Sequence, residues 1–396
     1  MSELFTKGAG YEVICALEQA GYEAVFVGGA VRDYLLGNAA KDIDVATSAE
    51  PYEVKAVFRN TIDVGIAHGT ILVLFEGEPI EVTTFRTEGT YTDHRRPDKV
   101  QFVKSLHEDL LRRDFTMNAI ALTKEGQLVD PFGGREDMEN HCIRAVGNPA
   151  DRFKEDALRM LRAIRFSSVL NFTIEKETLL AICNYAEQIR HVSIERLKIE
   201  MDKLFMGMNP VNAFQYMGKS GLDIHLPLIP SKRDNLQRAI PFATAVEGWV
   251  YLTIEGEFHP SEMAKVYKLS NNERHIISSV IELYEKRTVR AFTIEDYYLY
   301  ELDELKMVEK FFRTFQQNCS FIDDDEIEKR KTALPIHSIK DLAVNGTDLI
   351  QWAALKGGQW TGEWIKKIEF AVLHQTCKNE PTQIKEWFCY EFNREN

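Results

Sequence analysis

The chain has 396 residues, 44% of them hydrophobic and 28% charged, which is enough for about two to four domains with buried cores. Its formal charge of −13 argues against a protein that binds nucleic acid over its whole surface, so any such contact would use local clusters of lysine and arginine. No run approaches roughly 18 apolar residues and no basic N-terminal segment precedes an apolar one, which argues against membrane spanning and secretion. The six cysteines are dispersed without a CxxC pair, a pattern typical of reduced thiols in a cytoplasmic protein.

The first chemical signal is the stretch FVGGAVRDYLLGNAAKDIDV. The apolar run Ala24–Val27 predicts a buried strand, and Gly28 and Gly29 interrupt it. A helix is predicted over residues 30–36, because the composition there is helical and a glycine follows it. A glycine turn at a helix N-terminus can hold phosphate, although such a turn is more often only a turn, and it does not match the G-x-G-x-x-G dinucleotide fingerprint.

A second strand is predicted to carry Asp42 and Asp44. Side chains alternate along a strand, so these two carboxylates would share one face and could hold a metal ion. A solvated strand edge is the more common reason for an Asp-x-Asp pattern. The combination of GGAVRD with DID nevertheless favours a nucleotide site.

The rest of the first 145 residues alternates helix and strand signals, which predicts one sheet domain with helices. Glu81 is a candidate third carboxylate if its strand lies beside the one that carries Asp44, and edge solvation is the equal alternative. Helices are predicted at 11–20 and 52–59, and strands at 70–75, 80–85, 99–103 and 119–122.

Two polar segments follow these strands. Residues 87–99, TEGTYTDHRRPDK, indicate a mobile loop that is either a plain surface connection or a functional lid. In LRRDFTMNAIA, Arg113 could reach a triphosphate, because its planar guanidinium suits phosphate oxygens. Asp114 and Asn118 would then pin the local backbone, and a surface turn with an ion pair is the alternative.

From about residue 151 the composition becomes helical, and one continuous helix is predicted over 155–166. Arg159, Arg162 and Arg165 recur every three residues and form a basic stripe on it. Asp156 lies three residues before Arg159, so both side chains could address one object beside the helix. A local salt bridge on a solvated face is the alternative.

Taken together, these motifs resemble the class II nucleotidyltransferases, the family of bacterial tRNA CCA-adding enzymes and their poly(A) polymerase relatives. GGAVRD with DID resembles motif A of that family, and TYTDHRRPDK, which contains Asp93 and Arg96, resembles the flexible-loop motif C. RRDFTMNA resembles motif B, EDALR with Glu155 resembles motif D, and IERLKIE resembles motif E. The resemblance spans about residues 24–205, half of the chain.

The resemblance implies an α+β N-terminal nucleotidyltransferase head, polymerase β-like and with a mixed sheet, followed by an all-α C-terminal half. The implied regions are a catalytic head at 1–145, a helical neck at 146–205 with the nucleotide-selecting helix, a body at 206–290 and a tail at 291–396. The body and tail would bind tRNA.

The implied activity is the addition of C, C and A to the 3′ end of tRNA from CTP and ATP, by a two-metal mechanism that releases pyrophosphate. Asp42 and Asp44 would hold two Mg²⁺ ions, and Asp156 with Arg159 would match the pairing edges of cytosine and adenine. Gly28, Gly29, Arg32 and Arg113 would hold the triphosphate and ribose, with Arg162 and Arg165 near the nucleotide.

Three alternatives remain. A poly(A) polymerase typically carries an arginine-rich stretch where this chain has GIAHGT, and it also has a basic tail, whereas no basic tail follows residue 380 here. Both differences favour the CCA-adding branch. A CC-adding enzyme tends to lack the flexible loop. An RNA-binding module on a degenerate nucleotidyltransferase fold would not need both Asp42 and Asp44. The sequence leaves the oligomeric state open.

Overall fold

The structure is a computed structural model that describes residues 3–40, 43–88, 100–316 and 319–395. It divides into two compact units, here called unit 1 and unit 2. The sequence-based division into head, neck, body and tail stays a prediction. Unit 1 contains residues 1–232, 240–248 and 266–268, and unit 2 contains residues 233–239, 249–265 and 269–396.

Unit 1 begins with a seven-stranded mixed sheet in the order β3-β4-β5-β2-β1-β8-β9. Strand β1 is antiparallel to both of its neighbours, whereas β2 and β5 run parallel. This sheet confirms the α+β head expected from the sequence. Its strands are β1 (Ala24–Val27), β2 (Asp44–Thr47), β3 (Thr61–Gly65), β4 (Thr70–Phe75), β5 (Glu78–Thr84), β8 (Ala121–Leu122) and β9 (Leu128–Val129).

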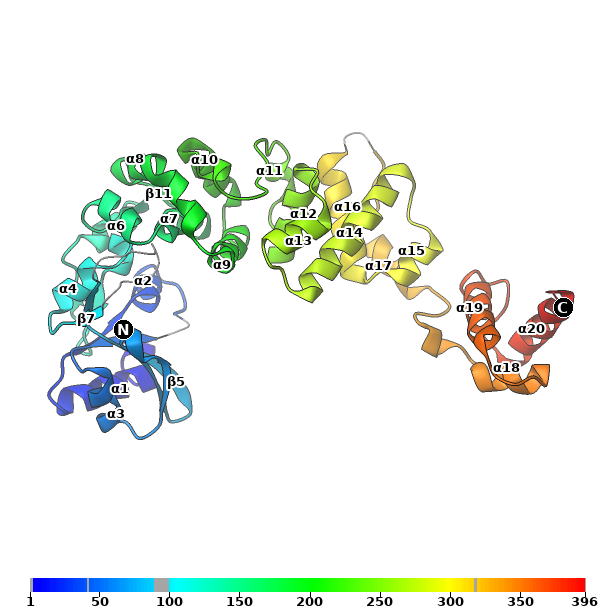
Figure 1. The fold of residues 1–396 in the computed structure, drawn as a ribbon, viewed down its shortest axis with the longest axis horizontal. Helices are drawn as coiled ribbons and strands as arrows, with labels where there is room; N and C mark the ends of the chain where they lie inside the picture. The colour runs from blue at the N-terminus through cyan, green and yellow to red at the C-terminus, as the bar shows by residue number, and fades with distance from the viewer. Residues whose placement is uncertain (1–2, 41–42, 89–99, 317–318, 396) are drawn as a thin grey trace. The chain divides into compact units, whose positions relative to one another are not determined.

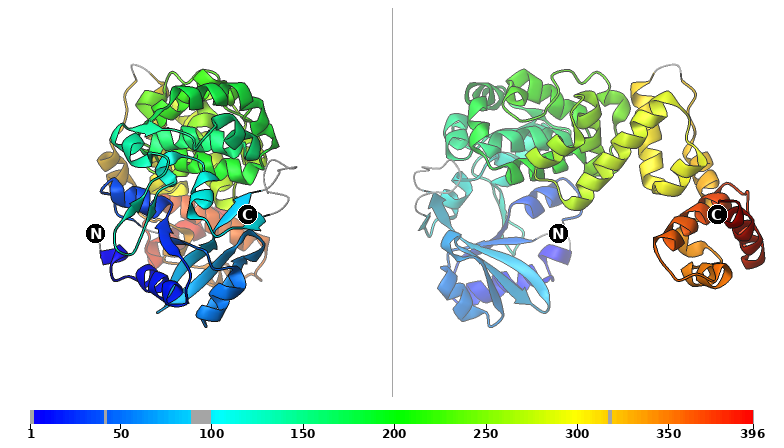
Figure 2. Two further views of the ribbon diagram at one scale, coloured as in Figure 1. Left: turned by 90° about the vertical axis from the view of Figure 1, so that its left-hand side faces the viewer. Right: turned by 45° about the vertical axis from the view of Figure 1, so that its right-hand side comes forward.

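Strand β1 is the centre of the head, because all four of its residues are buried. Its side chains alternate between two layers. Val25 and Val27 pack in a cluster that includes Leu110 of α4 (Leu106–Leu111). Phe26 meets the ring of Phe5 at a centroid distance of 4.9 Å, on the side covered by α1 (Ala9–Gln19). Figures 1 and 2 show α1 and α3 (Pro51–Val57) beside the strands of this sheet.

The predicted strands of the head are present, some of them with shifted ends. The strands at 24–27 and 70–75 have the predicted bounds, and the strand at 80–85 begins two residues earlier. The strand predicted at 99–103 is β7 (Val100–Phe102), which pairs with β6 (Arg86–Glu88) in a separate sheet. Edge strand β3 was not predicted; its two large apolar side chains, Ile62 and Val64, are exposed.

The helix predicted over 155–166 is wrong. Two helices, α6 (Pro149–Glu155) and α7 (Leu158–Val169), are separated at Asp156, whose backbone is extended at φ −143° and ψ 105°. The Asp156 carboxylate accepts a hydrogen bond from the Leu158 backbone N–H at 3.1 Å. Aspartate competes with helix formation through such local bonds, so one residue interrupts a segment of helical composition.

Helix α9 (Ile194–Phe205) begins directly after Ser193, its N-cap residue. Among the described residues after 146, the regular elements are helices except for β11 (Thr173–Ile174), which pairs in parallel with β10 (Cys142–Ile143). The remaining helices of unit 1 are α2 (Gly29–Leu35), α5 (Gly134–Glu139), α8 (Lys176–Tyr185) and α10 (Pro210–Ser220).

Each secondary-structure element described in unit 2 is a helix, and the core of this unit includes the buried Leu283 of α14 (Asn271–Val289) and Phe311 of α16 (Leu302–Phe315). The acidic run at 323–326 begins α17 (Asp324–Thr332), with Asp323 as the N-cap residue and the other three acids in the first turn. Helices α12 (Ala245–Glu255) and α13 (Pro260–Val266) have residues in both units. The others are α11 (Leu236–Ala239), α14 (Asn271–Val289), α15 (Ile294–Leu299), α16 (Leu302–Phe315), α17 (Asp324–Thr332), α18 (Gly346–Ala353), α19 (Gln359–Leu373) and α20 (Pro381–Glu395).

Among the helices of the described residues, none has the length and apolar character required to cross a membrane.

Candidate active site

A cavity of about 770 Å³ in unit 1 collects most of the residues singled out from the sequence. It lies where the turn after β1, the start of β2, the segment after α4 and the break between α6 and α7 meet. The lining includes the predicted Gly28, Gly29, Arg32, Asp44, Arg113, Asp114, Asn118, Asp156, Arg159, Arg162 and Arg165. Glu81 and Glu155 are not among the lining residues, and Asp42, Asp93 and Arg96 lie outside the described residues.

The charges of this lining suit a polyanion. Eight cationic side chains outnumber four carboxylates, although the chain as a whole is acidic. A concave site lined mainly by one sign of charge concentrates ligands of the opposite sign. The cations are Arg32, Arg112, Arg113, Arg159, Arg162, Arg165, Arg196 and Lys203, and the carboxylates are Asp33, Asp44, Asp114 and Asp156.

The carboxylate of Asp44 and the guanidinium of Arg113 both lie close to the glycine turn at Gly28. Gly28 has a φ of 75°, a conformation that residues with a side chain rarely adopt. A Cβ at this position would lie 3.2 Å from Asp44 Oδ2 and 3.6 Å from Arg113 Nη1. Gly28 is therefore required both by its backbone conformation and by the close approach of these two side chains.

Asp44 is the first residue of β2 and pairs in register with Val27 on one side and Glu81 on the other. Residues in register on neighbouring strands share a face, so Glu81 lies beside Asp44. This was the condition for Glu81 to be a candidate third carboxylate. Among the described residues, no group of three or more His, Cys, Asp or Glu side chains could hold a metal ion. Mg²⁺ typically uses only one or two carboxylates together with substrate phosphates, and the Asp44 carboxylate fits that donor set.

Arg113 is fixed by a buried carboxylate that sequence reasoning missed. Asp109 accepts hydrogen bonds from Arg112 Nη2 at 2.7 Å and from Arg113 Nη2 at 3.1 Å. Burial raises the pKa of Asp109, but the two arginines more than offset this, and its pKa lies below the ordinary value. Arginines at i+3 and i+4 of an aspartate in EDLLRR were the available signal.

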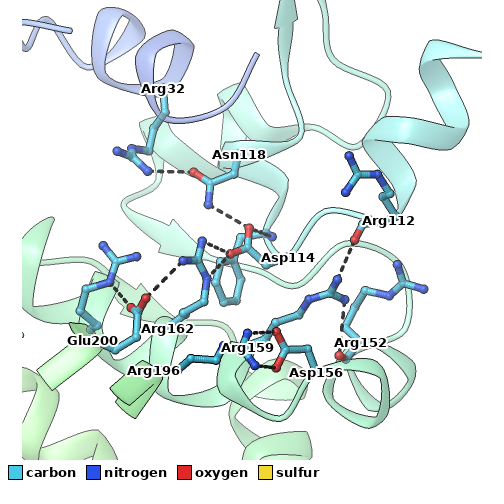
Figure 3. A network of polar contacts seen from close by, with 12 residues as sticks. Arg32, Arg112, Asp114, Asn118, Arg152, Asp156, Arg159, Arg162, Arg196 and Glu200 are labelled. Atoms are coloured by element: carbon cyan, nitrogen blue, oxygen red, sulfur yellow. Dashed lines mark hydrogen bonds and ion pairs between the residues drawn. The ribbon is translucent and has the colours of Figure 1, made fainter. Parts of the chain in front are cut away.

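A chain of hydrogen bonds runs from α2 to α7 (Figure 3). Arg32 donates to Asn118 at 2.9 Å, Asn118 donates to Asp114 Oδ1 at 2.9 Å, and Arg162 Nε donates to Asp114 Oδ2 at 2.8 Å. Asp114 also accepts from the backbone N–H of Phe115 at 2.8 Å, which pins the local backbone. Asp114 is therefore the centre of the contact between the head and the helices that follow it.

The alternative of a local salt bridge between Asp156 and Arg159 on a solvated face is wrong. Arg159 and Arg165 are only 8% and 7% exposed. Arg165 Nε donates to Glu200 of α9 at 2.7 Å, and its guanidinium lies 3.6 Å from the centroid of the Phe166 ring. Burial lowers the pKa of Arg165, and Glu200 partly offsets the effect.

Asp156 and Arg159 line the same cavity but each has a different partner. Asp156 receives both terminal nitrogens of Arg196, at 3.2 and 2.6 Å. Arg159 Nη1 donates to Glu155 at 2.6 Å, and its Nη2 donates to the carbonyl of Arg112 at 2.9 Å. Arg196 and Glu200, four residues apart in IERLKIE, were not singled out from the sequence.

The pH dependence of the free energy of unfolding should show how much the Asp114 carboxylate contributes to stability. Burial raises the pKa of its carboxyl, but Arg162 and Asn118 more than offset this and hold its pKa at about 2, below the ordinary 3.8. A carboxyl with a lowered pKa stabilises the fold fully above its ordinary pKa, and this stabilisation is lost as the pH falls through the lowered value. We therefore expect the free energy of unfolding to fall between about pH 5 and pH 2, and to fall less in Asp114→Asn.

Denaturant unfolding followed by circular dichroism, at several pH values in this window, measures the difference. Equal pH slopes in the two proteins would contradict the role given to Asp114.

Comparison with known proteins gives consistent matches along the chain. Residues 24–144 match the family described as "Poly A polymerase head domain", residues 171–231 match "Probable RNA and SrmB- binding site of polymerase A", and residues 240–388 match a tRNA nucleotidyltransferase domain 2.

Whole-chain relatives agree with these matches. A CCA-adding enzyme of Bacillus cereus (strain AH820) is 42% identical over 97% of this chain and 98% of its own length. A CCA-adding enzyme of Anoxybacillus flavithermus is 42% identical over the full length of both chains. The crystal structure of the Bacillus stearothermophilus CCA-adding enzyme in complex with CTP has a TM-score of 0.84 and 37% identity, over 98% of this chain and 97% of that one.

Proposed function

Because the chain belongs to the family of CCA-adding enzymes, which are tRNA nucleotidyltransferases, we propose that it adds C, C and A to the 3′ end of tRNA from CTP and ATP. The observation that carries this proposal is the cationic cavity in which Asp44 and Arg113 meet at the Gly28 turn. A triphosphate needs cations along its length and a carboxylate-held metal ion at the reacting phosphorus. The match of residues 171–231 to an RNA-binding region supports tRNA as the partner.

The proposed reaction is an in-line displacement. The 3′ oxygen of the RNA forms a bond to the α-phosphorus of the nucleotide, the bond from that phosphorus to the β-phosphate oxygen breaks, and pyrophosphate leaves. Asp44, with Asp42, would hold Mg²⁺, which when bound lowers the pKa of the 3′ hydroxyl and neutralises charge on the leaving group. Arg113, oriented by Asp109, would donate to phosphate oxygens.

Selection of the base would fall to Asp156 and Arg159, which line the same cavity. Cytosine and adenine both present an amino donor beside a ring acceptor. Uracil and guanine present a carbonyl oxygen at the position of that amino group, and two acceptors facing each other in a closed site cost about 1–3 kcal/mol.

Asp156→Ala should lose discrimination between nucleotides more than it loses metal-dependent chemistry. The preference for CTP over UTP, and for ATP over GTP, is expected to fall about 10- to 100-fold. Steady-state incorporation with each nucleotide gives the ratios of kcat/KM. An unchanged preference would show that Asp156 does not read the base.

Growth of a tRNA that lacks its 3′ end tests the function as a whole. Purified protein with Mg²⁺ receives CTP alone, ATP alone, or both, and the products are resolved at single-nucleotide length. Growth by two with CTP, and by one more only when ATP is present, is expected. A stop after two residues with both nucleotides would indicate CC addition, and a long adenosine tract would indicate polyadenylation.

A further inference from the structure

The ion pair between Asp156 and Arg196 has a geometry that a surface salt bridge rarely has. Both terminal nitrogens of Arg196 reach both oxygens of Asp156, and the two side chains are 24% and 15% exposed. The residues are 40 positions apart, on α9 and at the break between α6 and α7 (Figure 3). A two-point pair with a planar guanidinium fixes the plane of the carboxylate as well as its position.

Without such a partner, the orientation of Asp156 would be poorly defined. Its backbone N–H donates to the carbonyl of Arg152 at 3.2 Å and its carbonyl accepts from the Arg159 N–H at 3.0 Å, but these bonds hold the main chain and not the carboxylate. One contact comes from its own segment, the Leu158 N–H that donates to Oδ1 at 3.1 Å. Arg196 supplies the remaining constraint from a different helix.

The two carboxylate oxygens of Asp156 accept different numbers of hydrogen bonds. Each carboxylate oxygen has two lone pairs. Among the contacts of the described residues, Oδ1 accepts from both Leu158 and Arg196, whereas Oδ2 accepts from Arg196 Nη2 alone. Oδ2 therefore keeps one position for a further donor, which suits a single amino group on a base.

We propose that Arg196 is a positioning residue for base selection, which holds Asp156 so that Oδ2 faces the amino group of cytosine or adenine. The inference rests on the proposed function. Helix α9 is suited to this role because Glu200, one turn further along it, fixes Arg162 and Arg165 in the same cavity. One face of α9 thus orients charged side chains from the α6–α7 segment.

The test compares nucleotide preference in Arg196→Ala, Arg196→Lys and wild type, as the ratio of kcat/KM for CTP over UTP on a tRNA lacking its 3′ end. Arg196→Ala is expected to lower the ratio about tenfold or more, because the carboxylate is no longer held. Arg196→Lys keeps the charge but not the two-point contact of the planar guanidinium, so its ratio should lie between those of Arg196→Ala and wild type. Lys198→Ala removes a cation from the same helix, one that pairs with Asp202 and does not line the cavity, and should keep the wild-type ratio.

A double variant distinguishes positioning from direct contact with the nucleotide. If Arg196 acts through Asp156, adding Arg196→Ala to Asp156→Ala should change the ratio no further. A further loss in the double variant, or a wild-type ratio in a folded Arg196→Ala, would overturn the inference. Circular dichroism establishes folding, and Arg196→Lys carries the test if the alanine variant does not fold.

The two proposals fail in different ways. A wild-type protein that adds nothing to tRNA would refute the proposed function. If the wild-type protein adds C, C and A, and Arg196→Ala keeps the wild-type preference for CTP over UTP, only the positioning role is refuted.

Discussion

Asp44→Asn is expected to lower nucleotide incorporation about 10³-fold or more, because a metal ion contributes several kcal/mol of charge stabilisation and each 1.36 kcal/mol corresponds to a factor of ten. Asp44 is the described carboxylate that reaches the glycine turn, where a Cβ on Gly28 would lie 3.2 Å from its Oδ2. Asparagine keeps the size of the side chain and removes its charge. The loss should therefore appear in turnover and not in stability.

Single-turnover incorporation of labelled CTP at saturating Mg²⁺ measures this loss. Asp63→Asn is a matched control, because Asp63 lies on edge strand β3 of the same sheet and pairs with Lys55 away from the cavity. Turnover of Asp44→Asn within tenfold of wild type would refute the assignment of Asp44 to metal binding.

The second large effect concerns stability. Asp114→Ala should destabilise unit 1 by about 3–5 kcal/mol, the usual consequence of removing one partner of a buried ion pair. Asp114 is 9% exposed and its carboxylate accepts from both Asn118 and Arg162. Its loss leaves the Arg162 guanidinium facing an apolar methyl group and breaks the connection from Arg32 to α7.

Hydrogen exchange resolved by peptide measures the effect locally, and is expected to show faster exchange in α7 and around Asn118. All five tryptophans lie in unit 2, so tryptophan fluorescence follows the unfolding of that unit and serves as an internal reference. Asp151→Ala is the control, because Asp151 is an exposed acid on α6. Wild-type exchange in Asp114→Ala would contradict the central role of this residue.

The parts of the fold that could be predicted from the sequence are those with a local cause. The run AVFV gave β1 its bounds, because four consecutive apolar residues suit a strand buried on both faces. Ser193 marked the start of α9 through its N-cap position. The turn at Gly28 could be predicted because glycine signals a change of direction.

The break at Asp156 and the partners of the arginines could not be predicted in this way. EDALRMLRAIRF has helical composition throughout, and an aspartate can either continue a helix or end one. The contact that accompanies the break comes from Arg196, 40 residues away. The arginines of α7 have the spacing of a solvated stripe, and only the packing of α9 against them shows that Glu200 pairs with two of them, Arg162 and Arg165.

The division of the chain has a practical consequence for protein engineering. After leaving unit 1 at residue 232, the chain returns to it at 240–248 and again at 266–268. The first return places Gly248 against the buried ring of Phe205, where an added Cβ would lie 2.2 Å from Cγ. The second brings the Tyr267 hydroxyl to the carbonyl of Pro227 at 2.5 Å. A truncation at residue 232 would therefore uncover aromatic surface, and a fragment meant to carry the active site alone should extend to at least residue 268.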